Sequence, residues 1–150
     1  MANTYTQLYV MLVFGAKGHQ NLIRPEIETE LFKYICGIAK NLGQFILEIN
    51  GSTDHIHILC SIKPDKSISD FVRDIKANSS RFINEKKWFV GKFHWQTGCG
   101  AFSYSRSQID NVRKYIQNQK EHHKKNSFRE EYAKLLESFK IEYDDKYIFE

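Results

Sequence analysis

Apolar residues alternate with polar ones, or run on continuously, along four short stretches of the chain, and they recur three and four residues apart along four longer ones. The short stretches are rich in aromatic and β-branched residues and predict strands at residues 4–14, 44–50, 54–62 and 101–105. The longer stretches predict helices at residues 25–42, 67–84, 107–121 and 128–140. The Asn50-Gly51 pair predicts a hairpin turn between the second and third strands.

The first six predicted elements follow the order strand, helix, strand, strand, helix, strand. This order indicates an α+β fold, the ferredoxin-like split βαβ sandwich, in which one antiparallel sheet carries two helices on one face. The helix over residues 107–121 is then available to cover the open face and to carry catalytic residues there. A chain of 150 residues can bury one core of this kind, so we expect residues 1–150 to form a single domain.

Two histidines stand two residues apart in the third predicted strand. In a strand, residues i and i+2 point to the same face, so His55 and His57 point one way and the neighbouring isoleucines point the other. If the isoleucines face the two helices, the histidines lie on the open face. Their spacing of about 6 to 7 Å lets both rings reach one metal ion. Most such pairs are half-exposed surface residues, so the pair alone does not establish a metal site.

A tyrosine and a glutamine lie four residues apart in the predicted third helix. Residues i and i+4 are neighbours on a helix, so Tyr115 and Gln119 project together. An amide oxygen is a hard ligand suited to Mg²⁺ or Mn²⁺, and Gln119 would give such an ion three ligands together with His55 and His57. The remaining positions of an octahedral ion would be free for water or phosphate oxygens, with the Tyr115 phenol one helical turn away.

A phenol is a weak nucleophile at neutral pH because its ordinary pKa is about 10, so it needs an ion that makes its target more electrophilic. Attack by Tyr115 on a phosphodiester would form a phosphotyrosine ester. This ester keeps the energy of the broken bond, so a free DNA hydroxyl can reverse the reaction or join a new strand. Tyr104 and Tyr132 compete for this role, but Tyr104 lies in a predicted strand.

The charge of the chain favours a polyanionic partner. Lys and Arg number 22 against 18 Asp and Glu, which gives a net charge of +4 and a pI near 8.9. Four basic residues are candidates for contact with DNA phosphates: Arg73, Lys76, Arg81 and Arg113. A charged helix face is equally typical of simple exposure to solvent. Adjacent residues do not share a helix face, so His122 and His123 predict a solvated or phosphate-contacting patch rather than a second metal site.

The chain shows no signal for secretion or membrane insertion. Its three cysteines are an odd number at wide spacings, which is typical of a reducing compartment rather than of a disulfide framework. No apolar run approaches 18 residues, and the first residues lack the basic start and apolar centre of a signal peptide. We therefore expect a cytoplasmic, nucleoid-associated protein without a membrane partner.

The strand Asp54-His55-Ile56-His57 resembles the His-hydrophobic-His motif of the HUH superfamily of single-strand nucleases. The chain is similar to the single-tyrosine transposase branch of that superfamily, including its REP-associated members. The resemblance also covers Ile75-Lys76, residues 95–103, and Tyr115-Ile116-Gln117-Asn118-Gln119.

The resemblance implies a divalent metal bound by the two histidines and Gln119. It also implies that Tyr115 attacks single-stranded DNA to leave a 5′-phosphotyrosine and a free 3′ hydroxyl. Further implications are an obligate homodimer, in which the tyrosine helix can serve either protomer, and binding of DNA hairpins at the ends of an insertion element.

Two other classes of function remain open on the sequence. RNA-recognition domains share the same order of strands and helices, so the chain could be a non-catalytic single-stranded nucleic-acid-binding module, although its central strands lack the expected aromatic-glycine pattern. A metal hydrolase in which the two histidines and a carboxylate position water is the third interpretation, and it predicts no covalent DNA adduct.

Overall fold

The computed structural model describes residues 3–148, so the first and last two residues of the expected 1–150 domain lie outside the described part. The four strands are β1 (Tyr9–Gly15), β2 (Phe45–Gly51), β3 (His55–Ser61) and β4 (Gly100–Tyr104). The α-helices are α1 (Pro25–Asn41), α2 (Ile68–Lys86), α3 (Ile109–Gln117), α4 (Gln119–His122) and α5 (Phe128–Ser138). Two short 3₁₀ turns, η1 (Lys17–His19) and η2 (Arg106–Gln108), precede α1 and α3.

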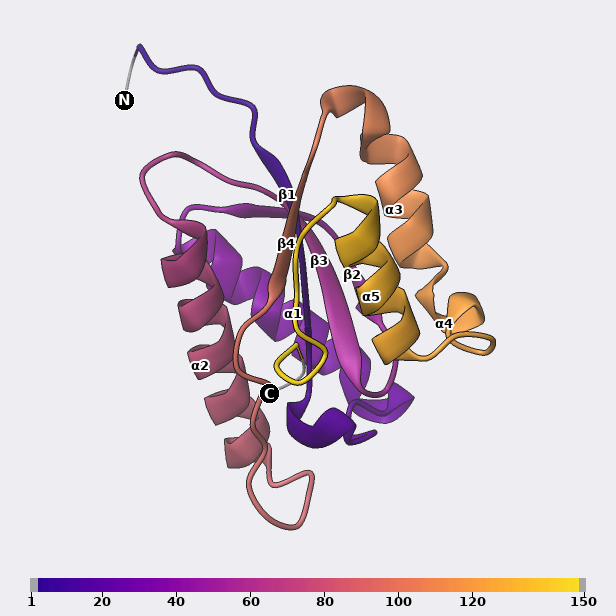
Figure 1. The fold of residues 1–150 in the computed structure, drawn as a ribbon. Coiled ribbons are helices and arrows are strands. Elements are labelled where there is room, and N and C mark those ends of the chain that lie inside the picture. The colour runs from indigo at the N-terminus through magenta and orange to yellow at the C-terminus, as the bar shows by residue number, and fades with distance from the viewer. Residues whose placement is uncertain (1–2, 149–150) are drawn as a thin grey trace.

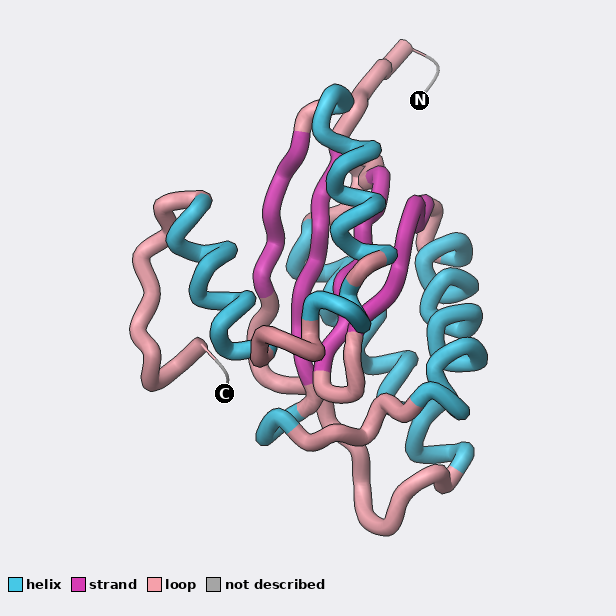
Figure 2. The backbone as a smooth tube through the Cα atoms, turned by 90° about the vertical axis from the view of Figure 1, so that its right-hand side faces the viewer, coloured by secondary structure: helices cyan, strands magenta, loops and turns pink. Residues whose placement is uncertain are grey.

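The strands form one antiparallel sheet in the order β2-β3-β1-β4. Figure 1 shows α1 and α2 on one side of this sheet and α3, α4 and α5 on the other. Figure 2, turned by 90°, shows α3 in front of the strands and the C-terminal helix beside it. The predicted ferredoxin-like α+β sandwich is confirmed, and the predicted third helix does cover the face that the first two leave open.

Each face of the sheet has its own hydrophobic core, as the alternation of strand residues requires. On the α1 and α2 side, Ile56 and Ile58 of β3 are fully buried. On the opposite side, Leu59 of β3 packs with residues of α3 and α5, such as Ile116 and Tyr132. The side chains of β3 are therefore divided between the two faces as the sequence predicts.

The hairpin between β2 and β3 differs from its prediction. Residues 52–54 form the turn, and Gly51 still belongs to β2, where it pairs with Ile56. Gly51 is required by close approach, because a Cβ atom there would lie 2.1 Å from the carbonyl oxygen of His55. The first strand also begins later than predicted, at Tyr9, because its neighbours end opposite that residue, at Ser61 and Tyr104.

The predicted helix over residues 107–121 is broken into two helices at Asn118, whose φ and ψ are −91° and 11°. The side chain of Asn50, on β2, donates hydrogen bonds to the carbonyl oxygens of Ile116 (3.0 Å) and Gln117 (3.2 Å) at the end of α3. These carbonyls have lost their helical partners, so the amide of Asn50 caps the helix. The cap joins the edge strand to the segment that carries Tyr115 and Gln119.

Candidate functional site

His55 and His57 are fully buried side by side on β3, beneath α3 and α5. Their ring centroids lie 5.2 Å apart, with the ring planes at 78°. The prediction that both rings occupy the face opposite α1 and α2 is confirmed. Because neither side chain is exposed, the interpretation of the pair as half-exposed surface histidines is wrong.

The two predicted residues of the third helix reach the histidine pair. The Oε1 atom of Gln119, at the start of α4, lies 3.0 Å from Nε2 of His55. The ring of Tyr115, on α3, stands edge-on to His57 with a centroid separation of 5.7 Å. Gln119 is fully buried, whereas Tyr115 is partly exposed. The fold therefore gathers all four residues that the sequence selects for catalysis and metal binding.

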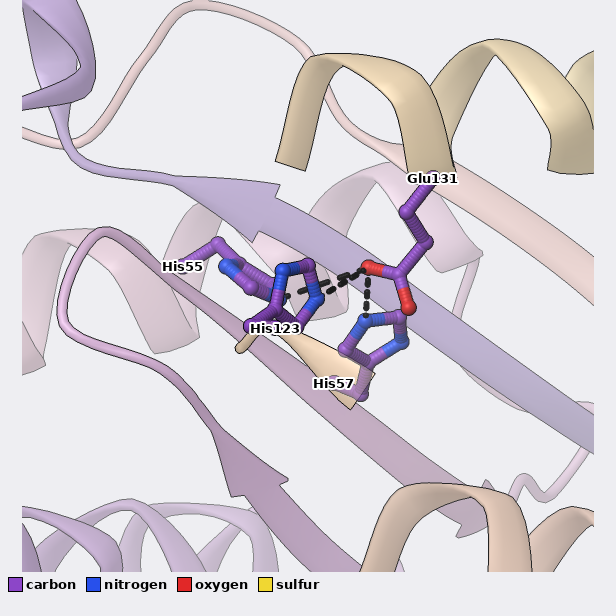
Figure 3. A group of neighbouring side chains, drawn as sticks. All are labelled: His55, His57, His123 and Glu131. Carbon is purple, nitrogen blue, oxygen red and sulfur yellow. Dashed lines mark hydrogen bonds and ion pairs between the residues drawn. The ribbon is translucent and has the colours of Figure 1, made fainter. Parts of the chain in front are cut away.

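A carboxylate from the C-terminal helix stands at the centre of this group. The Oε1 atom of Glu131, on α5, lies 2.9 Å from Nε2 of His57 and 3.4 Å from Nε2 of His55. Its Oε2 atom accepts hydrogen bonds from Nε2 of Gln119, at 2.8 Å, and from the hydroxyl of Tyr115. Figure 3 shows this carboxylate pointing from α5 toward the imidazole rings. Glu131 thus contacts all four residues predicted for catalysis and metal binding.

His123, which follows α4, also turns into the site. Its Nε2 atom lies 3.0 Å from Oε1 of Glu131, and its side chain is only 6% exposed. The expectation of a solvated or phosphate-contacting patch is therefore wrong for His123, because the break at Asn118 redirects the chain toward the sheet. Nε2 of His122, which is more exposed, lies 3.4 Å from the other oxygen of Glu131.

The sequence carries one signal for Glu131, which is its position among the apolar residues of the C-terminal helix. It lies three residues after Phe128 and four before Leu135, and residues at these spacings share a helix face. A carboxylate among the apolar positions of an amphipathic helix is buried with them and requires a partner there. His123 gave no comparable signal, since its placement depends on the turn between α4 and α5.

The charges in the site stabilise one another. Burial alone would raise the pKa of Glu131, but hydrogen bonds with His123, His55 and His57 outweigh burial and hold this pKa well below its usual range. Burial lowers the pKa of His55, but hydrogen bonds to Asp54 and Glu131 raise it overall to about 9. Burial and the charge of Glu131 raise the pKa of Tyr115, so its phenol keeps its proton.

The polar atoms of the site fit a bound cation. Nδ1 of His55 lies 2.8 Å from a carboxylate oxygen of Asp54, which can only accept a hydrogen bond when ionised. The ring therefore carries a proton on Nδ1, and in the neutral ring Nε2 points a lone pair at oxygens of Gln119 and Glu131. Lone pairs that face one another require a proton or a metal ion between them. A carboxylate behind a metal-binding histidine is a common supporting contact.

The four basic residues predicted to contact DNA are divided between the two layers of helices. Arg73, on α2, is exposed and pairs with Asp70 at 3.1 Å and Asp74 at 3.2 Å. Arg81, also on α2, hydrogen-bonds Asn78. Helix α2 lies on the opposite side of the sheet from α3 and α5 (Figure 1), so neither arginine adjoins the histidine site directly.

Lys76 is held by the loop before β4, whereas Arg113 is more exposed and pairs with β2. The ammonium group of Lys76 donates to the carbonyl oxygen of Gln96, at 2.9 Å, and to that of Gly98, and burial lowers its pKa. It thereby fixes the loop before β4. Arg113, on α3, pairs with Glu48 of β2 at 3.3 Å, on the same layer as Tyr115.

Within residues 3–148, no helix combines the length and apolar character needed to cross a membrane.

The comparisons with known proteins agree with one another. The family model of IS200-like transposases matches residues 4–119. The ISDra2 transposase TnpA of Deinococcus radiodurans is 27% identical over 120 residues, which cover 75% of this chain and 84% of that protein.

Two solved structures share the fold. A putative transposase of Deinococcus radiodurans R1 superposes with a TM-score of 0.63 at 22% identity, over 78% of this chain and 94% of that one. A REP-associated tyrosine transposase bound to a REP hairpin superposes with a TM-score of 0.62 at 13% identity, over 81% of this chain and 72% of that one. With the family model covering most of its length, this chain belongs to the IS200-like transposases.

Proposed function

We propose that this transposase cleaves and rejoins single-stranded DNA through a covalent 5′-phosphotyrosine at Tyr115, with a Mg²⁺ or Mn²⁺ ion held by His55, His57 and Gln119. Residues 1–150 would act as one domain. The observation that carries this proposal is the meeting of Tyr115 and Gln119 with the buried histidine pair around one carboxylate. A module that only binds DNA needs no such cluster of buried polar side chains. Assembling the cluster is unfavourable because every side chain in it loses its contact with water.

The side chains of the site would divide the work between them. The hydroxyl of Tyr115 donates its hydrogen bond to Oε2 of Glu131, so the proton has a recipient when the oxygen attacks phosphorus. The new bond joins the Tyr115 oxygen to phosphorus, and the bond from phosphorus to the 3′ oxygen breaks. The proton held by Glu131 then returns to the 3′ oxygen to give the free hydroxyl. A divalent ion bound beside these groups would supply a Lewis acid for the non-bridging phosphate oxygens.

The partners are also proposals. We propose single-stranded DNA as the substrate, with hairpins at element ends bound by the basic residues; the REP-associated neighbour, which is bound to a hairpin, supports this choice. Arg73, Arg81 and Arg113 are the candidates with exposed charge, whereas Lys76 would first have to leave its two carbonyl partners. A homodimer and a cytoplasmic, nucleoid-associated location complete the proposal.

The test uses a single-stranded oligonucleotide library labelled at its 3′ end, incubated with the full chain and Mn²⁺ or Mg²⁺. Attack at the 5′ side of the released fragment should leave the 3′ label on protein that survives denaturing electrophoresis. Tyr115→Phe should abolish the adduct, and Tyr104→Phe, a matched variant at the rival tyrosine, should retain it. Absence of an adduct, or an adduct that forms equally with Tyr115→Phe, would show that the mechanism is wrong.

A further inference from the structure

The segment after Gln119 brings two more metal-binding side chains to the histidine pair. We propose that His123 and Glu131 bind the same divalent ion as His55 and His57, and that this donor set favours Mn²⁺ over Mg²⁺. The inference rests on the proposed function, since it concerns the ion of that site. The family match ends at Gln119, so both additional ligands come from the part of the chain beyond it.

The donor atoms converge as a metal site requires. One ligand atom from each of His55, His57, His123 and Glu131 lies within 4.8 Å of all the others. Three imidazole Nε2 atoms approach a single carboxylate oxygen, Oε1 of Glu131, at 2.9 to 3.4 Å. All four side chains are buried or nearly so, which separates this cluster from the acidic surface groups that gather without binding an ion.

The hydrogen bond on the far side of His123 fixes the ring for metal binding. Nδ1 of His123 lies 2.8 Å from the backbone carbonyl oxygen of Asn126, and a carbonyl can only accept. The proton of the neutral ring therefore sits on Nδ1, and the lone pair of Nε2 faces the carboxylate of Glu131. His55 is arranged in the same way by Asp54. Two rings held with inward lone pairs are the usual supporting arrangement of metal-ligating histidines.

The chemistry of the donors selects the ion. Mg²⁺ prefers oxygen ligands and keeps several waters, whereas three imidazoles and one carboxylate suit transition metals. Mn²⁺ accepts both nitrogen and oxygen donors, and with Gln119 as the fifth protein ligand one octahedral position remains for phosphate or water. With three nitrogen donors, the site should bind Mn²⁺ at least about 10-fold more tightly than Mg²⁺.

Because Glu131 would be one of its ligands, the bound ion would also help to hold α5 against the sheet. Glu131 is on α5, while His55 and His57 are on β3, so one ion would join the C-terminal helix to the sheet. Because a site assembled from separate elements forms only when they are docked, the ion stabilises the docked arrangement. Metal binding should therefore protect α5 from proteolysis as well as raise the melting temperature.

The experiment measures Mn²⁺ binding by the full chain directly, from the loss of the paramagnetic resonance signal of free Mn²⁺, with competition by Mg²⁺. Glu131→Gln and His123→Gln should each weaken Mn²⁺ binding by at least about 10-fold. Glu130→Gln is the matched control, because Glu130 is the exposed neighbour on α5 and glutamine can keep its hydrogen bond with Ser127. Circular dichroism melts in EDTA establish that each variant is folded.

His57→Asn separates this inference from the proposed function. If His57→Asn loses Mn²⁺ binding while Glu131→Gln and His123→Gln bind as the unmodified chain does, the two extra ligands are wrong and the histidine-pair site stands. If His57→Asn also binds normally, the metal site of the proposed function fails. Equal affinity for Mg²⁺ and Mn²⁺ would overturn the metal preference.

Discussion

The hydroxyl of Tyr115 on α3 donates a hydrogen bond to Glu131 on α5, and the other carboxylate oxygen of Glu131 faces the two histidines of β3. One side chain thus connects the proposed nucleophile to the proposed metal ligands. The pairing holds the phenol in place and gives its proton a recipient, which neither histidine does.

Replacing Glu131 by glutamine should slow covalent adduct formation even when Mn²⁺ is saturating. The amide has the size of the carboxylate but cannot take the Tyr115 proton, and general-base contributions are on the order of 10²- to 10⁴-fold. Single-turnover rates with labelled single-stranded DNA measure the effect. Glu130→Gln should react at the unmodified rate. An unchanged rate for Glu131→Gln at saturating metal would exclude a role in proton transfer.

Replacing Asn50 by alanine should weaken the junction between β2 and the end of α3. The side chain donates to two carbonyls and accepts from Lys120 at 2.7 Å, so its loss should lower the free energy of unfolding by about 1 to 2 kcal/mol. Adduct formation should also fall, because Gln119 follows the capped turn directly. Urea denaturation and adduct assays measure both effects. Asn111→Ala, on the exposed face of α3, should change neither by a comparable amount.

Replacing Gly51 by alanine should disrupt the hairpin that presents His55. The added methyl group would meet the backbone of His55 and Ile56, which cannot move aside without breaking strand pairing. We expect a loss of about 3 kcal/mol or more in the free energy of unfolding. Gly37→Ala, in α1, is the matched control. Its Cβ meets no atom within 4 Å among the described residues, so helix propensity should make it neutral or stabilising.

Cys60 should be the least reactive of the three thiols in the folded protein. Burial raises its pKa to about 12, so almost no thiolate exists at pH 8, and the sulfur is inaccessible. Cys36 and Cys99 are only partly buried and should be alkylated first by iodoacetamide. Peptide mapping by mass spectrometry after timed alkylation gives the order. Alkylation of Cys60 at the rate of the other two in folded protein would contradict its burial.

Replacing Arg73, Arg81 or Arg113 singly by glutamine should weaken the binding of single-stranded DNA. For each variant, the loss of affinity should be similar whatever the base sequence of the DNA. Each lost phosphate contact should reduce the slope of log affinity against log salt by about 1. Titrations at several salt concentrations measure that slope. Cleavage at saturating DNA should persist, because none of the three contacts the histidine site; its loss with intact binding would contradict a phosphate-contact role.

The parts of the site that could be predicted lie within single elements. Strand geometry places His55 and His57 on one face, and helix geometry places Gln119 one turn after Tyr115, so spacing alone indicates both pairs. The meeting of the two pairs followed from the ferredoxin-like order of elements, which leaves one face of the sheet for the third helix. Asn50, by contrast, predicted a turn but caps α3, because the pairing of Gly51 with Ile56 moves the turn to residues 52–54.

Residue spacing alone indicates which side chains share a face, because that spacing within a strand or a helix is fixed by backbone geometry. The addition of His123 and Glu131 to the histidine pair depends on the packing of the folded chain. Their approach depends on the break at Asn118, the turn before α5 and the packing of Phe128 and Tyr132 on the sheet. These are contacts between segments far apart in sequence, and no local period encodes them. Local spacing indicates the histidine pair and the burial of Glu131, but it does not indicate that the carboxylate meets the histidines.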